Sequence, residues 1–160
     1  MTHLTGNSFI AGQIRRGRRT RREFQEIENK MENVNVAIIK SLYEAFGRGD
    51  IPFIMGNMSH GVSFEYEAPA TIPYSGTRHG VEQVIGFFEG IGASEKDMNL
   101  VMNQYIASGD EVASFGRYDT TVKSSGKRIT TPVAHYWEFK DGKVVRFMNF
   151  INTAARADAV

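Results

Sequence analysis

The sequence predicts an α+β domain in which a curved antiparallel sheet wraps around N-terminal helices. Apolar residues first recur at the three- and four-residue spacing of helices and later alternate at the two-residue spacing of strands. The turn dipeptides Gly109-Asp110 and Asp141-Gly142 then join neighbouring strands into hairpins. Helices followed by a strand meander pack over one face of a sheet. A sheet that curls around a helix leaves a cone, whose mouth can take a ligand.

The composition is that of one folded domain without disulfides. The 160 residues are 41% hydrophobic and 23% charged, which is ordinary for a globular chain that buries one core. No apolar run approaches the roughly 18–20 residues that cross a membrane, and we see no secretory signal in residues 1–14. The lack of cysteine excludes thiol catalysis and thiolate metal sites. We therefore expect a cytoplasmic protein without a membrane partner.

The N-terminal segment is strongly basic, whereas the rest of the chain is mildly acidic. The first 30 residues hold seven Lys and Arg, six of them between Arg15 and Arg22, against three Glu. Residues 31–160 are left with 12 basic and 15 acidic residues. A phosphate-binding patch is one interpretation of the arginines, but no aromatic or base-reading module accompanies them. We expect residues 1–22 to be a flexible solvated arm, and nucleic acid is not an expected partner.

A long first helix follows this arm. Thr20 and Glu23 have the spacing of a capping box. One apolar stripe then recurs every three or four residues, formed by Phe24, Ile27, Met31, Val34, Ile38, Leu42 and Ala45. Gly47 and Gly49 end the helix. Its strongest part covers residues 34–46.

The remaining elements alternate in type before the strand meander begins. Asp50 and Pro52 have the positions of an N-cap and a first-turn proline. The predicted elements are a second helix to about Met58, a strand over 62–67, a third helix over 79–91, strands over 97–108 and 111–123, and a final hairpin over 129–152. Residues 153–160 are predicted to be a short polar tail.

The final hairpin is predicted to form the wall of a pocket. Two sets of residues share faces at period two: Val133, His135, Trp137 and Phe139 before the turn, and Val145, Phe147, Asn149 and Ile151 after it. A polar group buried among apolar ones needs a partner, a water or a ligand. We therefore expect His135, Trp137 and Asn149 to face the interior of the cone.

Three stretches resemble the SnoaL-like branch of the nuclear transport factor 2-like superfamily, which includes ketosteroid isomerases and small polyketide cyclases. They are Leu-Tyr-Glu-Ala-Phe-Gly-Arg-Gly-Asp at 42–50, Pro-Tyr-Ser-Gly at 73–76 with the apolar helix after it, and Trp-Glu-Phe-Lys-Asp-Gly-Lys-Val-Val-Arg at 137–146. The resemblance implies a cone-shaped α+β barrel over residues 23–155, with a C-terminal tail at 156–160. Met31 is a second candidate for the natural start. A shared scaffold does not by itself imply a shared activity.

The resemblance also bears on the chemistry. Catalysts of this family place a carboxylate and a His, Tyr or Asp partner inside the cone. Cyclase-like members have a His at the position of His135 and an Asp at the position of Asn149. The amide can orient a carbonyl, but it cannot carry a proton at neutral pH. The base of the isomerases corresponds to Ala68, so standard isomerase chemistry is not expected.

Other residues must then carry any proton transfer. We expect His135 and Glu67 to be catalytic, since burial can raise the pKa of a glutamate into the useful range. The expected substrate contacts are Tyr66, Tyr118, Trp137 and Asn149. Glu65 and Tyr136, next to these residues in the sequence, are further candidates for proton transfer. The alternatives are that Glu65 and Glu67 line a solvated strand face and that His135 and Trp137 are core residues.

The predicted function is binding of a small, largely apolar, carbonyl-bearing molecule. Isomerisation, cyclisation or hydrolysis by acid–base chemistry is one possibility, and a non-catalytic ligand-binding or dimerisation module is the other. The sequence leaves open whether the domain is an enzyme. The four histidines lack ligand spacing and no glycine-rich phosphate loop follows a strand, so neither a metal nor a cofactor is expected.

A homodimer is expected because relatives of this fold commonly pair through the sheet. The interface would be the exposed face of the long strands between residues 97 and 123. These strands carry more apolar surface than one core face needs, from Leu100, Met102, Tyr105 and Ile106.

Overall fold

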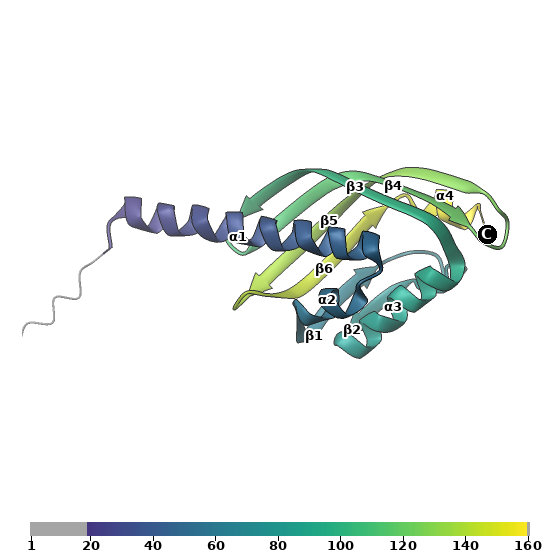
Figure 1. Cartoon of the computed structure of the whole chain (residues 1–160), viewed down its shortest axis with the longest axis horizontal. Coiled ribbons are helices and arrows are strands. Elements are labelled where there is room, and N and C mark those ends of the chain that lie inside the picture. Colours follow the sequence, from purple (N-terminus) through teal and green to yellow (C-terminus); the bar gives the residue numbers. More distant parts are fainter. Residues whose placement is uncertain (1–18, 160) are drawn as a thin grey trace, which may run out of the picture.

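The computed structural model describes residues 19–159, with three helices under the concave side of a curved six-stranded sheet (Figure 1). The elements in chain order are α1 (Arg21–Arg48), α2 (Ile51–Gly56), β1 (Met58–Tyr66), β2 (Gly76–His79), α3 (Val81–Ser94), β3 (Glu95–Ser108), β4 (Glu111–Val122), β5 (Arg128–Lys140), β6 (Lys143–Ile151) and α4 (Thr153–Ala157). The strand order β2-β1-β6-β5-β4-β3 leaves two edges, so the sheet does not close. The predicted α+β cone is confirmed.

The sheet is mixed and not purely antiparallel. The hairpin strands pair antiparallel as expected, and Asp141 and Gly142 turn between β5 and β6 with φ values of 51° and 74°. However, β1 pairs with β6 in parallel, with Phe64 opposite Phe147. Turn dipeptides determine direction only between consecutive strands. Because α3 lies between β1 and the meander in the chain, β1 is free to join β6 in either direction.

The capping box of α1 is confirmed, but only the C-terminal end of the predicted apolar stripe is buried. The Thr20 hydroxyl accepts a hydrogen bond from the Glu23 N–H, and the Glu23 carboxylate accepts one from the Thr20 N–H. Leu42 and Ala45 are buried and Ile38 is partly buried, whereas Phe24 is 58% exposed. The N-terminal half of α1 extends beyond the sheet, which explains this difference (Figure 1).

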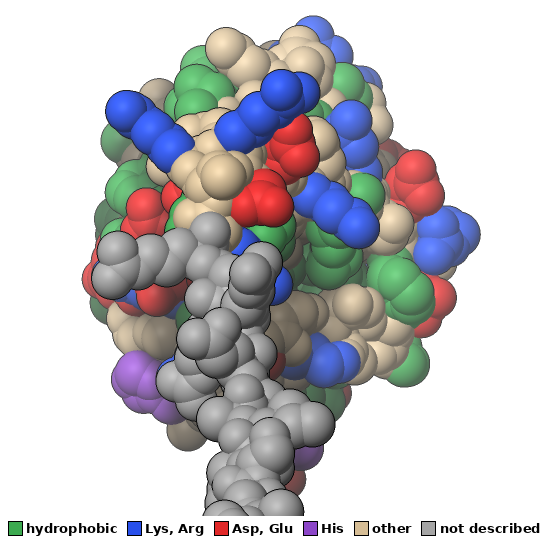
Figure 2. Space-filling model, turned by 90° about the vertical axis from the view of Figure 1, so that its left-hand side faces the viewer, with side chains coloured by type: hydrophobic (Ala, Val, Ile, Leu, Met, Phe, Trp, Pro, Cys, Tyr) green, Lys and Arg blue, Asp and Glu red, His purple; other side chains and the backbone are tan. Residues whose placement is uncertain are grey.

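Charges of both signs are mixed on the side from which α1 extends. Lys and Arg side chains lie among Asp and Glu side chains there and do not gather into one basic patch (Figure 2). Most of the expected basic arm, residues 1–18, lies outside the described residues. Its last residues, Arg21 and Arg22, belong to the first turn of α1.

The chain does not end in an irregular polar tail. Residues 153–157 form α4, and Asn152 caps this helix by accepting a hydrogen bond from the Ala155 N–H. The β4–β5 turn holds the helix in place, since the Ser125 hydroxyl donates to the carbonyl of Ala159. Arg156 is buried against the sheet. The prediction of a tail was wrong because residues distant in the sequence supply the partners that dock this segment.

Candidate functional site

A partly enclosed cavity of about 80 Å³ lies between the concave side of the sheet and the helices. Its walls are mostly apolar and include Leu42, Phe46, Ile54, Phe64, Phe87 and Phe147. A small number of polar side chains interrupt them: Tyr43, Tyr66, Tyr74, Tyr118, His135 and Asn149. A concave apolar site with a few convergent polar groups is typical of small-molecule binding.

His135 and Asn149 lie opposite each other on β5 and β6, and both line the cavity. The predicted inward orientation is therefore confirmed, and His135 is only 5% exposed. Its Nδ1 lies 2.8 Å from the Tyr43 hydroxyl, which in turn lies 2.6 Å from the Ser114 hydroxyl. Within residues 19–159, neither the Nε2 of His135 nor the Oδ1 of Asn149 has a hydrogen-bond partner, although both atoms are buried.

Burial keeps His135 uncharged, because it lowers the pKa of the imidazole to about 3. Burial also raises the pKa of the Tyr43 phenol, so this hydroxyl keeps its proton. If the Tyr43 hydroxyl donates to Nδ1, the Nε2 of His135 carries a hydrogen and donates. If Nδ1 donates to the hydroxyl, Nε2 accepts. In either tautomer the free ring nitrogen can make one hydrogen bond to a bound molecule.

Trp137 supports this arrangement and packs edge-on to the ring of Tyr43. Its Nε1–H donates to the Tyr43 hydroxyl at 3.1 Å and to the Ser114 hydroxyl at 3.3 Å. Its ring packs edge-on to Phe147 at a centroid distance of 4.5 Å. Trp137 therefore holds Tyr43 in place as well as lining the cavity. The sequence marked Tyr43 only as part of a family motif and gave no indication of Ser114.

Glu67 does not lie with His135. Because side chains alternate along β1, Tyr66 points into the cavity while Glu65 and Glu67 lie on the outer side of the sheet. Glu67 is exposed and accepts a hydrogen bond from the Thr77 hydroxyl. Glu65 pairs with Arg146, whose hydrogen bond lowers the pKa of the carboxyl. Glu67 therefore lies outside the cavity that holds His135, and the expectation that these two residues act together inside the cone is wrong.

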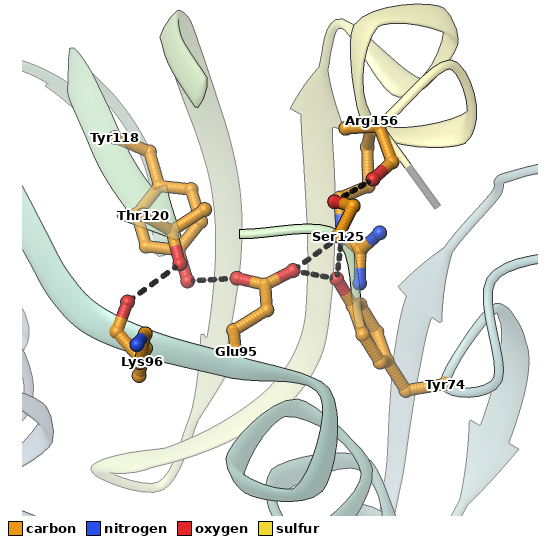
Figure 3. Close-up of polar contacts among 8 residues, drawn as sticks. Tyr74, Glu95, Lys96, Tyr118, Thr120, Ser125 and Arg156 are labelled. Atoms are coloured by element: carbon orange, nitrogen blue, oxygen red, sulfur yellow. Dashed lines mark hydrogen bonds and ion pairs between the residues drawn. The ribbon is translucent and has the colours of Figure 1, made fainter. Parts of the chain in front are cut away.

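A buried carboxylate does occur, at a position that the sequence analysis missed. Glu95, at the start of β3, is 2% exposed and lies beside Arg156 of α4 (Figure 3). The Arg156 Nε–H donates to its Oε1 at 2.6 Å, and the Tyr118 hydroxyl donates to its Oε2 at 2.6 Å. Tyr74 donates to the same carboxylate. No local pattern connects Glu95 with Arg156, which are 61 residues apart.

The cavity therefore brings together five of the six predicted site residues. These are His135, Tyr66, Tyr118, Trp137 and Asn149. Among the described residues, no group of three or more His, Asp and Glu side chains is placed to hold a metal ion. No helix within residues 19–159 is long and apolar enough to cross a membrane.

Comparison with known proteins identifies similar sequences and structures. Residues 39–147 match the family model of the SnoaL-like domain. The chain is similar to an NTF2-like protein of unknown function from Burkholderia pseudomallei K96243, with a TM-score of 0.75 and 26% identity over 79% of this chain and 97% of that one. No curated protein gave a significant match.

Two further structures share the fold at lower identity. One is TerC, co-crystallised with polyporic acid, with a TM-score of 0.72 and 24% identity over 79% of this chain and 97% of that one. The other is a protein from Jannaschia sp. CCS1 described as a SnoaL-like polyketide cyclase, with a TM-score of 0.72 and 19% identity over 81% and 93% of the two chains. At these identities the likeness concerns the fold alone.

Proposed function

The chain belongs to the SnoaL-like domain family, and on that premise we propose that it binds a small, largely apolar, carbonyl-bearing ring in the cavity under the sheet. The observation that carries the proposal is that two buried polar atoms of the cavity, His135 Nε2 and Asn149 Oδ1, have no hydrogen-bond partner among residues 19–159. Leaving such an atom without a partner costs about 1–3 kcal/mol. A ligand with polar groups at these two atoms offsets that cost.

The size of the cavity limits the ligand. Its volume of about 80 Å³ is below the roughly 150 Å³ of an engineered apolar cavity that takes up benzene. We therefore propose a ligand of about one ring, and side chains that line the cavity move to enlarge it when the ring binds. TerC, a fold relative, was co-crystallised with an organic acid, polyporic acid, which supports small-molecule binding in this fold.

Catalysis is the second candidate function. The free Nε2 of His135 is the one observation that favours it, since a positioned imidazole can take or give a proton. A general base works best when its pKa is near the working pH, whereas burial lowers the pKa of His135 to about 3. For this reason we propose ligand binding first. Cofactor-independent isomerisation, cyclisation or hydrolysis would require a substrate that changes the environment of the imidazole.

A titration with benzaldehyde and toluene tests the proposal, with NMR amide shifts as the readout. Benzaldehyde should bind about tenfold more tightly than toluene, because its carbonyl can accept from Nε2–H. The variant His135→Phe keeps a ring but removes both nitrogens, and this preference should disappear. Asn103→Leu, an exposed β3 substitution, should keep the preference. If neither ring binds, or if His135→Phe leaves the preference unchanged, the proposal fails.

We also propose a homodimer through the outer side of the sheet. The supporting residues differ from those expected. Leu100 lines the cavity and Tyr105 packs against Tyr43, because a register shift between Met102 and Gln104 reverses the alternation in β3. Of the expected residues Ile106 is exposed, and the other exposed apolar residues on the outer side include Val101, Phe115 and Phe150. Light scattering of the wild type should give a dimer and Phe115→Glu a monomer; a monomeric wild type at micromolar concentration would refute the proposal.

A further inference from the structure

The cavity has a second polar region, which the proposed function does not use. Tyr118 on β4 and Tyr74 before β2 both line the cavity. Along β4, Tyr118 is four residues beyond Ser114, which lies in the His135 cluster. With a rise of about 3.3 Å per residue, this corresponds to roughly 13 Å between the two backbone positions. Since both side chains are on the inner side of the strand, Tyr118 lines a different part of the cavity from Tyr43 and His135, which lie beside Ser114.

The phenol protons in this region are directed toward Glu95. The Tyr118 hydroxyl donates to Oε2 at 2.6 Å, and the Tyr74 hydroxyl donates to Oε1 (Figure 3). Arg156 supplies the counter-charge through Nε, 2.6 Å from Oε1, and also donates to the Tyr74 oxygen at 3.1 Å. Burial raises the pKa of the Tyr118 phenol, so its proton stays in place. Glu95 itself is 2% exposed and does not belong to the cavity lining.

These hydrogen bonds determine which ligand groups can still bond to the Tyr118 oxygen. A phenol has one hydrogen to donate and lone pairs with which to accept. Since the hydrogen goes to Glu95, any ligand group that bonds to the Tyr118 oxygen must be a donor. Donation to a carboxylate also polarises the phenol and makes its oxygen a better acceptor. Tyr74 has already used one lone pair for Arg156, which leaves Tyr118 as the better acceptor of the two.

Building on the proposed function, we infer that the Tyr118 side of the cavity selects a hydroxyl group, so that the preferred ligands are hydroxylated rings and not the corresponding ethers. Glu95 is the positioning residue for this selection, and Arg156 holds Glu95. A ring that carries a carbonyl for His135 and a hydroxyl for Tyr118 satisfies both polar regions. The inference thus narrows the ligand class from carbonyl-bearing rings to phenolic or enolic ones.

The test compares phenol with anisole, its methyl ether, which can accept but not donate. Both are titrated into the full chain and followed by NMR amide shifts. Phenol should bind about tenfold more tightly to the wild type, as expected for one hydrogen bond to a polarised acceptor. Tyr118→Phe should bring the two affinities together. Tyr136→Phe is the matched control, because it makes the same change on a tyrosine that donates to a glutamate, Glu111, outside the cavity, and it should keep the tenfold preference.

Glu95→Gln tests the positioning role separately. The side-chain amide has a donor as well as an acceptor, so it no longer forces both phenols to donate. The phenol preference should fall at least threefold. Since this preference is a ratio measured within one variant, a loss of stability does not produce the change by itself. An unchanged preference in Glu95→Gln would overturn the positioning role.

Other outcomes overturn the inference or the function on which it rests. Equal affinities of phenol and anisole in the wild type, or a preference that is kept in Tyr118→Phe, would refute hydroxyl selection by Tyr118. Benzaldehyde binding that depends on His135 would still support the proposed function in that case. If phenol, anisole and benzaldehyde all fail to bind, both proposals are wrong.

Discussion

Replacement of Arg156 by methionine should destabilise the protein strongly. The Arg156 and Glu95 side chains are 6% and 1% exposed, and their closest atoms are 2.6 Å apart. Methionine keeps the apolar part of the side chain but leaves the Glu95 carboxylate buried without a counter-charge. Removal of one partner of a buried pair costs about 3–5 kcal/mol. Because domains are stabilised by only about 5–15 kcal/mol in total, the midpoint of urea unfolding should fall markedly with little change in m.

Arg146→Met provides the matched control on the outer side of the sheet. Arg146 and Glu65 form the same kind of pair, with Nε 2.8 Å from Oε1, but their side chains are 43% and 17% exposed. Water and salt screen such a pair, so the same substitution should lower the urea midpoint far less. Equal midpoints for Arg156→Met and Arg146→Met would refute the argument, since they would mean that Glu95 reaches water when Arg156 is absent.

A double variant completes the test. Glu95→Gln combined with Arg156→Met leaves no buried charge, and neutral replacement of a buried pair is tolerated better than removal of one partner. The double variant should therefore be more stable than Arg156→Met alone. The two substitutions should show a coupling free energy of about 0.5–3 kcal/mol. Additive losses would show that the two side chains act independently.

Three further predictions concern stability. Burial lowers the pKa of His135 to about 3, below its value of about 6.5 in an unfolded chain. Between these two pH values the unfolded state binds more protons than the folded state, so the urea midpoint should fall as the pH falls. The variant His135→Phe should flatten this dependence of the midpoint on pH. An unchanged slope in that variant would assign the effect to other groups. A chain that starts at Met31 should keep a cooperative thermal melt, because residues 21–31 are exposed; an insoluble or molten product would show that the projecting half of α1 belongs to the core. Gly116→Ala should cost about 1–3 kcal/mol, because its Cβ would lie 2.0 Å from the Val101 carbonyl oxygen. Gly92→Ala, where no atom lies within 4 Å, should not destabilise, and equal melting temperatures for these two variants would contradict the close approach.

Local patterns predicted most of the elements. The Thr20 capping box, the Asp50 cap and the Asp141-Gly142 turn all occur as expected. Each depends on hydrogen bonds or φ values within four residues, so the sequence nearby contains the whole cause. The inward orientation of His135 followed from period-two alternation along β5, but the position of Asn149 opposite it depends on a register shift at Glu138 and Phe139, so that Val144 and not the expected Val145 is buried.

The alternation of side chains along the first strand also predicts that Glu67 faces away from Tyr66, which excludes it from the pocket. Val62, Phe64 and Tyr66 alternate with the acidic residues of β1, and only one of these two sets can face the core. The exposed half of α1 has a different origin. Phe24 continues the apolar stripe of α1, yet periodicity describes a helix face and does not reveal where the sheet beneath it ends.

By itself the sequence determined most of the helices and strands, the hairpin turns and the family, because short-range geometry and side-chain alternation decide these. Only the tertiary structure decided that β1 lies parallel to β6 and that Glu95, Tyr118 and Arg156 meet. These contacts join residues that are far apart in the chain. Burying the charges costs free energy, which their pairing and the burial of apolar surface offset only when the whole sheet curves over the helices, and no neighbouring residue in the sequence decides this.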